Sequence, residues 1–234
     1  MDRFFKFFSW FFIFPLLGLT AETHLDRLVE YKALSQHDEQ NQTAKSIRNN
    51  AKQVLESKKI DSIIQEIGEL FYTGSYALDL MTWNDIDMQV IVKDGIDPIE
   101  ALSSIFNRIA KDPCFIEGQM IHFQGDYKPK MPRGLYLGIK MNCPDLGGLW
   151  KLDIWSLAKP DFEKNRMLIE TLKSKLDPQN RALILELKHE MMAGSERVPQ
   201  MGSHFLYQAI LLEGIRDKEA LYKYCTTQGV SIKK

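Results

Sequence analysis

Apolar residues recur along the chain with two different periods, and the period predicts which segments are helices and which are strands. Between residues 22 and 68 they return every three or four positions, as on one face of an amphipathic helix. The helical period reappears at residues 97–111 and from residue 160 to near the C-terminus. Short apolar runs and alternating positions predict strands at residues 70–72, 85–92, 115–123, 135–141 and 149–157.

The order of these segments predicts the fold class. Strands and helices mix in the first two thirds of the chain, and only helices follow. This order favours an α/β (α+β) fold, in which helices flank a mixed β-sheet and a helical appendage ends the chain. We therefore divide the chain into an N-terminal segment (residues 1–21), a sheet-containing domain with N-terminal helices (22–158) and a helical C-terminal region (159–234).

The first 21 residues have the pattern of a targeting segment. Arg3 and Lys6 precede an apolar run from Phe7 to Leu19, and the small residue Ala21 follows. The run is short for a membrane span but suits the core of a signal peptide. A start codon placed too far upstream, or a buried aromatic arm, would give the same pattern. A cytoplasmic location is expected, with export or membrane association through residues 1–21 as the alternative.

Composition and charge narrow the kinds of partner. Hydrophobic residues make up 44% of the chain and charged residues 26%, as in ordinary globular proteins. The formal net charge of −1 gives no general attraction to phosphate backbones, so a long nucleic acid is a less favoured partner than a small molecule. Cys114, Cys143 and Cys225 are too widely spaced for a disulfide framework or a zinc motif, which favours a reducing compartment.

The strand predicted at residues 85–92 begins with two acids. In an extended strand, residues two apart point to the same face, so Asp85 and Asp87 project together while Ile86, Met88 and Val90 face the other way. Two adjacent carboxylates repel each other unless a cation or a shared proton lies between them. The pattern therefore predicts a divalent metal at this strand.

A third acid, Asp153, lies in the middle of the apolar strand at 149–157. A charge there is costly without a partner. If this strand is a neighbour of the strand at 85–92, three carboxylates meet on one surface, a ligand set that suits Mg2+. Trp155 shares the face of Asp153, and it either packs in the core or stacks on a ligand ring.

A tight turn, Gly74-Ser75, comes shortly before the paired acids. Glycine allows close approach of the backbone to a phosphate, and the N–H groups and the Ser75 hydroxyl can donate hydrogen bonds to phosphate oxygens. This turn is not a Walker loop, because the chain contains no GxxxxGK[ST] sequence.

Together, Gly-Ser, nine intervening residues, Asp-x-Asp and a later Asp in an apolar strand resemble the DNA polymerase β-type nucleotidyltransferase superfamily. The narrower resemblance is to small antibiotic nucleotidyltransferases, which add AMP to aminoglycosides or lincosamides. It covers roughly residues 60 to 157 and rests mainly on the first of these signatures. It implies a nucleotidyltransferase-type mixed sheet, and ATP and Mg2+, as two ions, at the site.

The resemblance also implies a role for each matching residue. Gly74 and Ser75 would hold the β- and γ-phosphates of the nucleotide. Asp85 and Asp87 would bind the metals, and Asp153 would bind the second metal and act as, or orient, the base that deprotonates an acceptor hydroxyl. The expected reaction is transfer of a nucleoside monophosphate to a hydroxyl of a small molecule, with release of pyrophosphate.

Other functions and some departures from the family remain open. The acceptor could instead be a protein or an RNA end, or the chain could be a non-catalytic, antitoxin-type binding module. Many family members carry a basic or small residue and a glycine soon after Gly-Ser, where this chain has Tyr76 to Asp79. Asp79 would either perturb the triphosphate site or cap a local turn. The helices from residue 160 onward are expected to shape the acceptor pocket, alone or across a homodimer.

Overall fold

The computed structural model describes residues 19–123, 132–192 and 203–228, in two compact units. Residues 1–39 belong to the first unit and residues 40–234 to the second. Helix α1 (Leu19–Ser57) begins in the first and ends in the second. Of the predicted targeting segment, residues 1–18 lie outside the described residues. In the described parts of the chain, no helix has the length and hydrophobicity that a membrane crossing requires.

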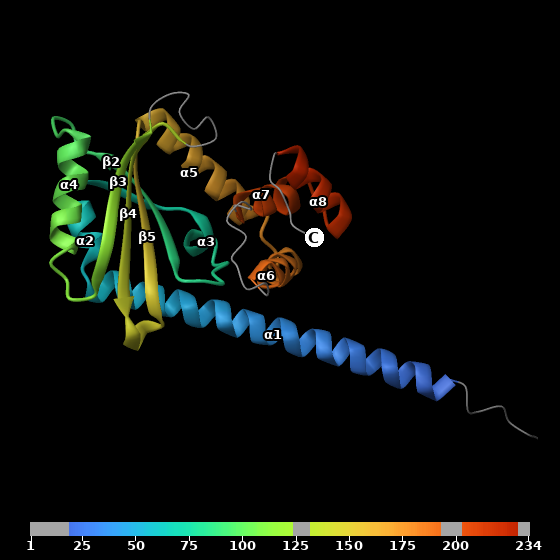
Figure 1. Cartoon of the computed structure of the whole chain (residues 1–234). Helices are drawn as coiled ribbons and strands as arrows, with labels where there is room; N and C mark the ends of the chain where they lie inside the picture. The colour runs from blue at the N-terminus through green and yellow to red at the C-terminus, as the bar shows by residue number, and fades with distance from the viewer. Residues whose placement is uncertain (1–18, 124–131, 193–202, 229–234) are drawn as a thin grey trace, which may run out of the picture. The chain divides into compact units, whose positions relative to one another are not determined.

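A five-stranded mixed sheet lies at the centre of the second unit (Figure 1). Its strands lie in the order β1-β2-β5-β4-β3; β2 and β5 are parallel, and all other neighbours are antiparallel. The predicted strands therefore exist, and the mixed sheet of the α+β prediction is confirmed. The strands are β1 (Gly68–Tyr72), β2 (Asp85–Val92), β3 (Phe115–Phe123), β4 (Gly134–Cys143) and β5 (Gly148–Leu157).

Helices precede, interrupt and follow the strands, as the apolar period predicted. Within the C-terminal region, where the sequence predicts only helices, α7 is a short α-helix that is followed by a π-helical segment, η3. A 3-10 turn, η2, follows β4. The remaining helices and turns are α2 (Ile60–Gln65), α3 (Gly74–Ala77), α4 (Pro98–Ile109), η2 (Pro144–Leu146), α5 (Lys159–Ser174), α6 (Pro178–Met192), α7 (Ser203–Tyr207), η3 (Gln208–Leu212) and α8 (Lys218–Thr227).

One face of the sheet is buried under α2 and α4, so the acids of β2 point to the other face. Ile86, Met88 and Val90 are all fully buried on the covered face, as the alternation predicted. Burying each such side chain contributes about 1.5–3 kcal/mol, which fixes the register of β2 against a one-residue slip. The position of α4 is set locally, because the Asp97 carboxylate accepts hydrogen bonds from the first N–H groups of that helix.

The C-terminal helices form a second apolar cluster, which also includes Leu78 and Leu80 from the loop before β2. In α6 the structure buries the apolar residues Ile184 and Leu187, and it also buries Lys188. The loop between the Gly-Ser turn and the paired acids is therefore part of the contact between the sheet and the helices.

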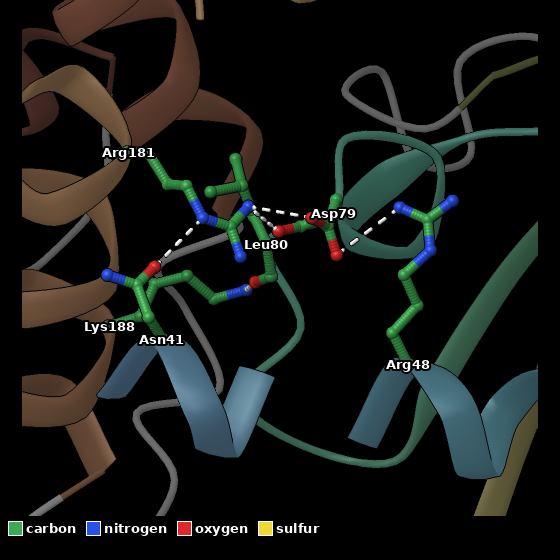
Figure 2. A network of polar contacts seen from close by, with 6 residues as sticks. All are labelled: Asn41, Arg48, Asp79, Leu80, Arg181 and Lys188. Carbon is green, nitrogen blue, oxygen red and sulfur yellow. Dashed lines mark hydrogen bonds and ion pairs between the residues drawn. The ribbon is translucent and has the colours of Figure 1, made fainter. Parts of the chain in front are cut away.

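Asp79 joins this loop to two helices (Figure 2). Its carboxylate forms ion pairs with Arg48 of α1 at 3.3 Å and with Arg181 of α6 at 3.1 Å. Arg181 also donates to the backbone carbonyl of Asp79 and, at 3.0 Å, to the side-chain oxygen of Asn41. Asp79 does end a local turn, as one sequence-based alternative expected, because it has a φ of 56° just after α3 and the N–H of Leu80 donates to the carbonyl of Ser75. The pairing of its charge with two guanidinium groups is a feature that neither alternative described.

We predict that Arg181→Met lowers the free energy of unfolding by about 1–3 kcal/mol, because it removes a mostly buried partner of the Asp79 carboxylate and carbonyl. The side chain of Arg181 is only 16% exposed. Arg166→Met is the matched control, since its pair with Glu163 is exposed on one helix and should change stability by less than about 0.5 kcal/mol. Urea unfolding measures both variants, and equal losses would contradict the role given to Asp79.

Candidate active site

The parallel pairing of β2 and β5 brings the three predicted acids together. Asp87 lies directly beside Asp153, and Asp85 lies beside Lys151. One oxygen of each carboxylate of Asp85, Asp87 and Asp153 lies within 4.8 Å of the other two. The prediction that the strands at 85–92 and 149–157 are neighbours is therefore correct, and the three acids form one cluster.

The three carboxylates repel one another, and the pKa of Asp87 reflects this repulsion. Burial, and then the charges of Asp85 and Asp153, raise the pKa of Asp87 to about 7. The pKa of Asp153 is also raised, mainly by burial and by the charge of Asp85. Three carboxylates that resist ionising together are a suitable ligand set for a divalent cation with oxygen ligands, such as Mg2+. The donor set therefore fits the predicted metal.

Lys151 supplies a positive charge within the cluster. Its ammonium is 2.5 Å from Asp153 Oδ2 and 3.7 Å from Asp85 Oδ1. Burial lowers the pKa of Lys151, but the neighbouring carboxylates, first that of Asp85, outweigh burial and raise it. Lys151 is therefore a charged partner of the acids and not the solvated lysine that sequence patterns suggest by default.

Tyr136 orients Asp153 from the adjacent strand β4. Its hydroxyl donates a hydrogen bond of 2.7 Å to Asp153 Oδ1. The hydroxyl reaches that oxygen across Gly138, which lies directly beside Asp153 in the sheet. A Cβ at Gly138 would lie 2.4 Å from the Tyr136 hydroxyl, so a side chain there would exclude this hydrogen bond. Tyr136 and Gly138 fix the rotamer of the third acid.

The predicted phosphate turn lies against the cluster. Gly74 and Ser75 begin α3, and the N–H of Thr73 donates to the backbone carbonyl of Asp87 at 2.9 Å. Gly74 has a φ of 59°, and a Cβ there would lie 2.0 Å from Asp87 Oδ2. Glycine is therefore required by both conformation and space. The turn and the paired acids, which are separated in sequence, touch in the structure.

Lys188 is a second cation near the acids, and sequence reasoning missed it. The residue is fully buried; its ammonium donates to the carbonyl of Leu80 at 2.5 Å and to the Tyr207 hydroxyl at 3.1 Å, and it lies 4.2 Å from the centre of the Trp83 ring. Its charge favours the ionised form of Asp87. A lone lysine on the apolar face of the predicted helix was the available signal.

Tyr136 and Gly138 were missed too, because their role depends on the register between β4 and β5, which no residue spacing encodes. Trp155, expected either in the core or against a ligand, packs on Phe123 and Tyr136 with ring centres 5.2 and 5.0 Å away. It therefore packs against Tyr136, whose hydroxyl contacts Asp153.

The raised pKa of Asp87 predicts how stability depends on pH without metal. In the unfolded chain this carboxyl has its ordinary value of 3.8, so between that pH and about 7 the folded protein holds a proton that the unfolded chain has released. The stability from this proton is present at low pH and lost as the pH rises through 7. In chelator, the melting temperature should fall from pH 5 to pH 8, and Asp87→Asn should flatten the decline. An unchanged slope in the variant would contradict the assignment.

The contact between Gly74 and Asp87 predicts a steric effect on metal binding. Gly74→Ala should weaken Mg2+ binding roughly 10- to 100-fold, the range for residues that support a metal ligand. Gly95→Ala is the control, because Gly95 also has a positive φ, of 82°, but open space around its Cβ position. Calorimetric titration with Mg2+ measures both, and equal effects would assign the loss to backbone strain alone.

Comparisons with known proteins find similarity in structure only. No family model and no curated protein matches the sequence. The Cid1 poly(U) polymerase, in a structure with MgGTP bound, matches with a TM-score of 0.51 and 16% identity over 75% of this chain and 55% of that chain. CdnE, a STING-associated c-di-GMP synthase from Capnocytophaga granulosa, matches with a TM-score of 0.45 and 14% identity over 77% and 67% of the two chains. Terminal uridylyl transferase 4 from Trypanosoma brucei, with UPU bound, gives 0.44 and 12% over 83% and 61%.

The similarity to Cid1 confirms the predicted fold class. The chain spans just over half the length of the Cid1 chain that it matches. The narrower resemblance to antibiotic nucleotidyltransferases stays a prediction, since the three matches above are enzymes of other kinds. At this level of identity, the likeness to Cid1 concerns the arrangement of the sheet and its helices. The chain therefore has a nucleotidyltransferase-type fold, with a five-stranded mixed sheet flanked by helices.

Proposed function

We propose that this protein is a metal-dependent nucleotidyltransferase, which transfers a nucleoside monophosphate from a nucleoside triphosphate to an acceptor hydroxyl. The observation that carries the proposal is the cluster of Asp85, Asp87 and Asp153, with ligand oxygens within 4.8 Å of one another, against the Gly74-Ser75 turn. The nucleotidyltransferase fold supports this reading, because such a cluster and turn lie together on its sheet.

Each residue has a task that its position supports. The Gly74-Ser75 turn would bind the β- and γ-phosphates through backbone N–H groups and the Ser75 hydroxyl. Asp85 and Asp87 would hold two Mg2+ ions, and Asp153 would also bind the second of them. When bound, Mg2+ supplies neutralisation of the phosphate charge and alignment of the attacking and leaving oxygens. Lys188, which is buried and close enough to Asp87 to act on its charge, would keep the region below the phosphates positive.

Asp153 would prepare the acceptor. Its Oδ1 accepts from the Tyr136 hydroxyl, and its Oδ2 is contacted by the Lys151 ammonium. Once that ammonium has moved away, Oδ2 would accept, or orient, the proton of the attacking hydroxyl. The new bond joins the acceptor oxygen to the α-phosphorus, and the bond between that phosphorus and the bridging oxygen to the β-phosphate breaks. Pyrophosphate leaves with the electron pair of the broken bond.

The identities of the donor nucleotide and of the acceptor molecule are the more specific part of the proposal. We infer ATP as the donor, with AMP transferred to a small hydroxylated molecule, in the cytoplasm where ATP is available. The net charge of −1 favours this over a long nucleic acid. The match to a poly(U) polymerase favours an RNA end as the second candidate. Antibiotics are one class of small acceptor among several, and no comparison points to them.

A non-catalytic binding module is the alternative from a different class. Such a module needs a nucleotide-sized surface but not three acids that destabilise each other. The raised pKa of Asp87 therefore argues for a site that is selected to hold a metal. Nucleotide binding that does not depend on Mg2+ would favour the module.

We predict that Asp87→Asn and Asp153→Asn each reduce pyrophosphate release by at least roughly 100-fold, the scale on which preorganised charge contributes to catalysis. The assay supplies Mg2+ and each of four nucleoside triphosphates with a panel of hydroxylated small molecules, RNA and proteins. Asp145→Asn is the control, because Asp145 is exposed on η2 and should leave the rate unchanged. Wild-type rates in both cluster variants would show that the carboxylates are not catalytic.

A further inference from the structure

Four charged residues form one row across the open face of the sheet. In register from β2 to β3 they are Asp85, Lys151, Lys140 and Glu117. The row divides into two ion pairs, because Lys140 is 2.6 Å from Glu117 while Lys151 turns to Asp153 and Asp85. Two lysines that are neighbours on adjacent strands therefore have different partners.

The ammonium of Lys151 contacts carboxylate oxygens that a bound metal would need as ligands. Its ammonium contacts Oδ2 of Asp153 and Oδ1 of Asp85. The second oxygen of Asp153 accepts from Tyr136, so this carboxylate has no idle oxygen to give to a cation. A divalent cation bound between the acids would also be repelled by the positive charge of the Lys151 ammonium. The two positive groups therefore compete for one position.

A cavity of about 240 Å3 lies next to this position, on the same face of β3, β4 and β5. The side chain of Lys151 is 34% exposed and forms part of the cavity wall. Its long stem can therefore carry the ammonium from the acids into the cavity without any movement of β5. The side chains and glycines along the wall include Glu117, Gln119, Tyr136, Gly138 and Lys140.

We propose that Lys151 is an internal counter-ion that a divalent metal displaces, and that the displaced ammonium moves into the adjacent cavity and binds an anionic group of the acceptor. The second half rests on the proposed function; the first half does not. In the metal-free protein Lys151 offsets the repulsion among the acids. After displacement its charge has no carboxylate partner, whereas Lys140 keeps Glu117.

The class of acceptor follows from the position of this charge. The cavity wall includes Tyr136 and Lys151, which both contact Asp153. A group bound in the cavity would therefore belong to the molecule whose hydroxyl Asp153 prepares. Its volume is below the usual range for a whole drug-sized ligand and admits a phosphate with part of a sugar. The favoured acceptor therefore carries a phosphate near its reacting hydroxyl, as a nucleotide or the terminal nucleotide of an oligonucleotide does.

Metal affinity without nucleotide or acceptor tests the displacement. Titration of the full chain with Mn2+, followed by electron paramagnetic resonance, should show binding tightened roughly tenfold in Lys151→Met, which corresponds to the loss of one competing ion pair of about 1.4 kcal/mol. Lys140→Met should bind Mn2+ as the wild type does, since its ammonium pairs with Glu117. Unchanged or weaker binding in Lys151→Met would overturn the proposal.

A charge-retaining variant covers the case in which Lys151→Met does not fold. Lys151→Arg keeps the positive charge at this position but changes the ammonium to a forked guanidinium, which pairs more strongly with carboxylates. Its Mn2+ binding should be weaker than that of the wild type by roughly threefold or more, on the scale of an additional charged hydrogen bond. Tighter binding in Lys151→Arg would contradict the competition.

Binding of 5′-AMP and adenosine tests the anionic subsite. With Mg2+ present, the wild type should bind 5′-AMP more tightly than adenosine by fivefold or more in a nuclear magnetic resonance titration, and Lys151→Met should lose this preference. If the metal alone holds the phosphate, Lys151→Met will keep the preference for 5′-AMP over adenosine. That result would overturn the proposal that the displaced ammonium binds an anionic group. Because these measurements involve no turnover, an absence of transferase activity would count against the proposed function and leave both results intact.

Discussion

Repulsion among three carboxylates is the constraint on which the rest of the structure depends. Asp85, Asp87 and Asp153 lie on adjacent parallel strands, close enough that burial and mutual charge raise the pKa of Asp87 to about 7. Such an arrangement persists only if the surrounding fold is stable enough to hold it. The fully buried residues on the opposite face of β2 provide that stability, because a shift of register that separated the acids would expose all of them.

Several features near the acids are explained by this repulsion. Lys151 and Lys188 place positive charge on two sides of the cluster, one on the open face of the sheet and one under the loop before β2. Tyr136 donates to one oxygen of Asp153, and Gly74 leaves room for an oxygen of Asp87. Tyr136 and Gly74 thus position the carboxylates before any metal arrives, which lowers the cost of binding one, whereas the Lys151 ammonium has to leave when a metal binds.

The sequence predicted this site well where its parts are local, and poorly where they depend on pairing between strands. The period-two pattern of β2 placed Asp85 and Asp87 on one face, and the lone acid in the apolar β5 marked Asp153. Lys188 was missed because its contacts depend on the tertiary fold: Leu80 and Trp83 come from a loop about a hundred residues earlier, and Tyr207 comes from a later helix. The two ion pairs of Asp79 were missed for the same reason, since Arg181 lies far along the chain.

The same distinction explains why the donor side of the site is easier to identify than the acceptor side. The predicted phosphate turn and two of the acids come from one stretch of the chain, residues 74 to 87, so their spacing is visible in the sequence. The cavity beside Lys151 is built by side chains from β3, β4 and β5, and they meet only through the register of two antiparallel pairings. Because Gly138 must be small for Tyr136 to reach Asp153, the wall of the proposed acceptor cavity is tied to the geometry of the carboxylate cluster. A substitution at this wall would therefore alter the cluster as well, unless it is confined to Gln119, Lys140 and Glu117, which do not contact the three acids in this structure.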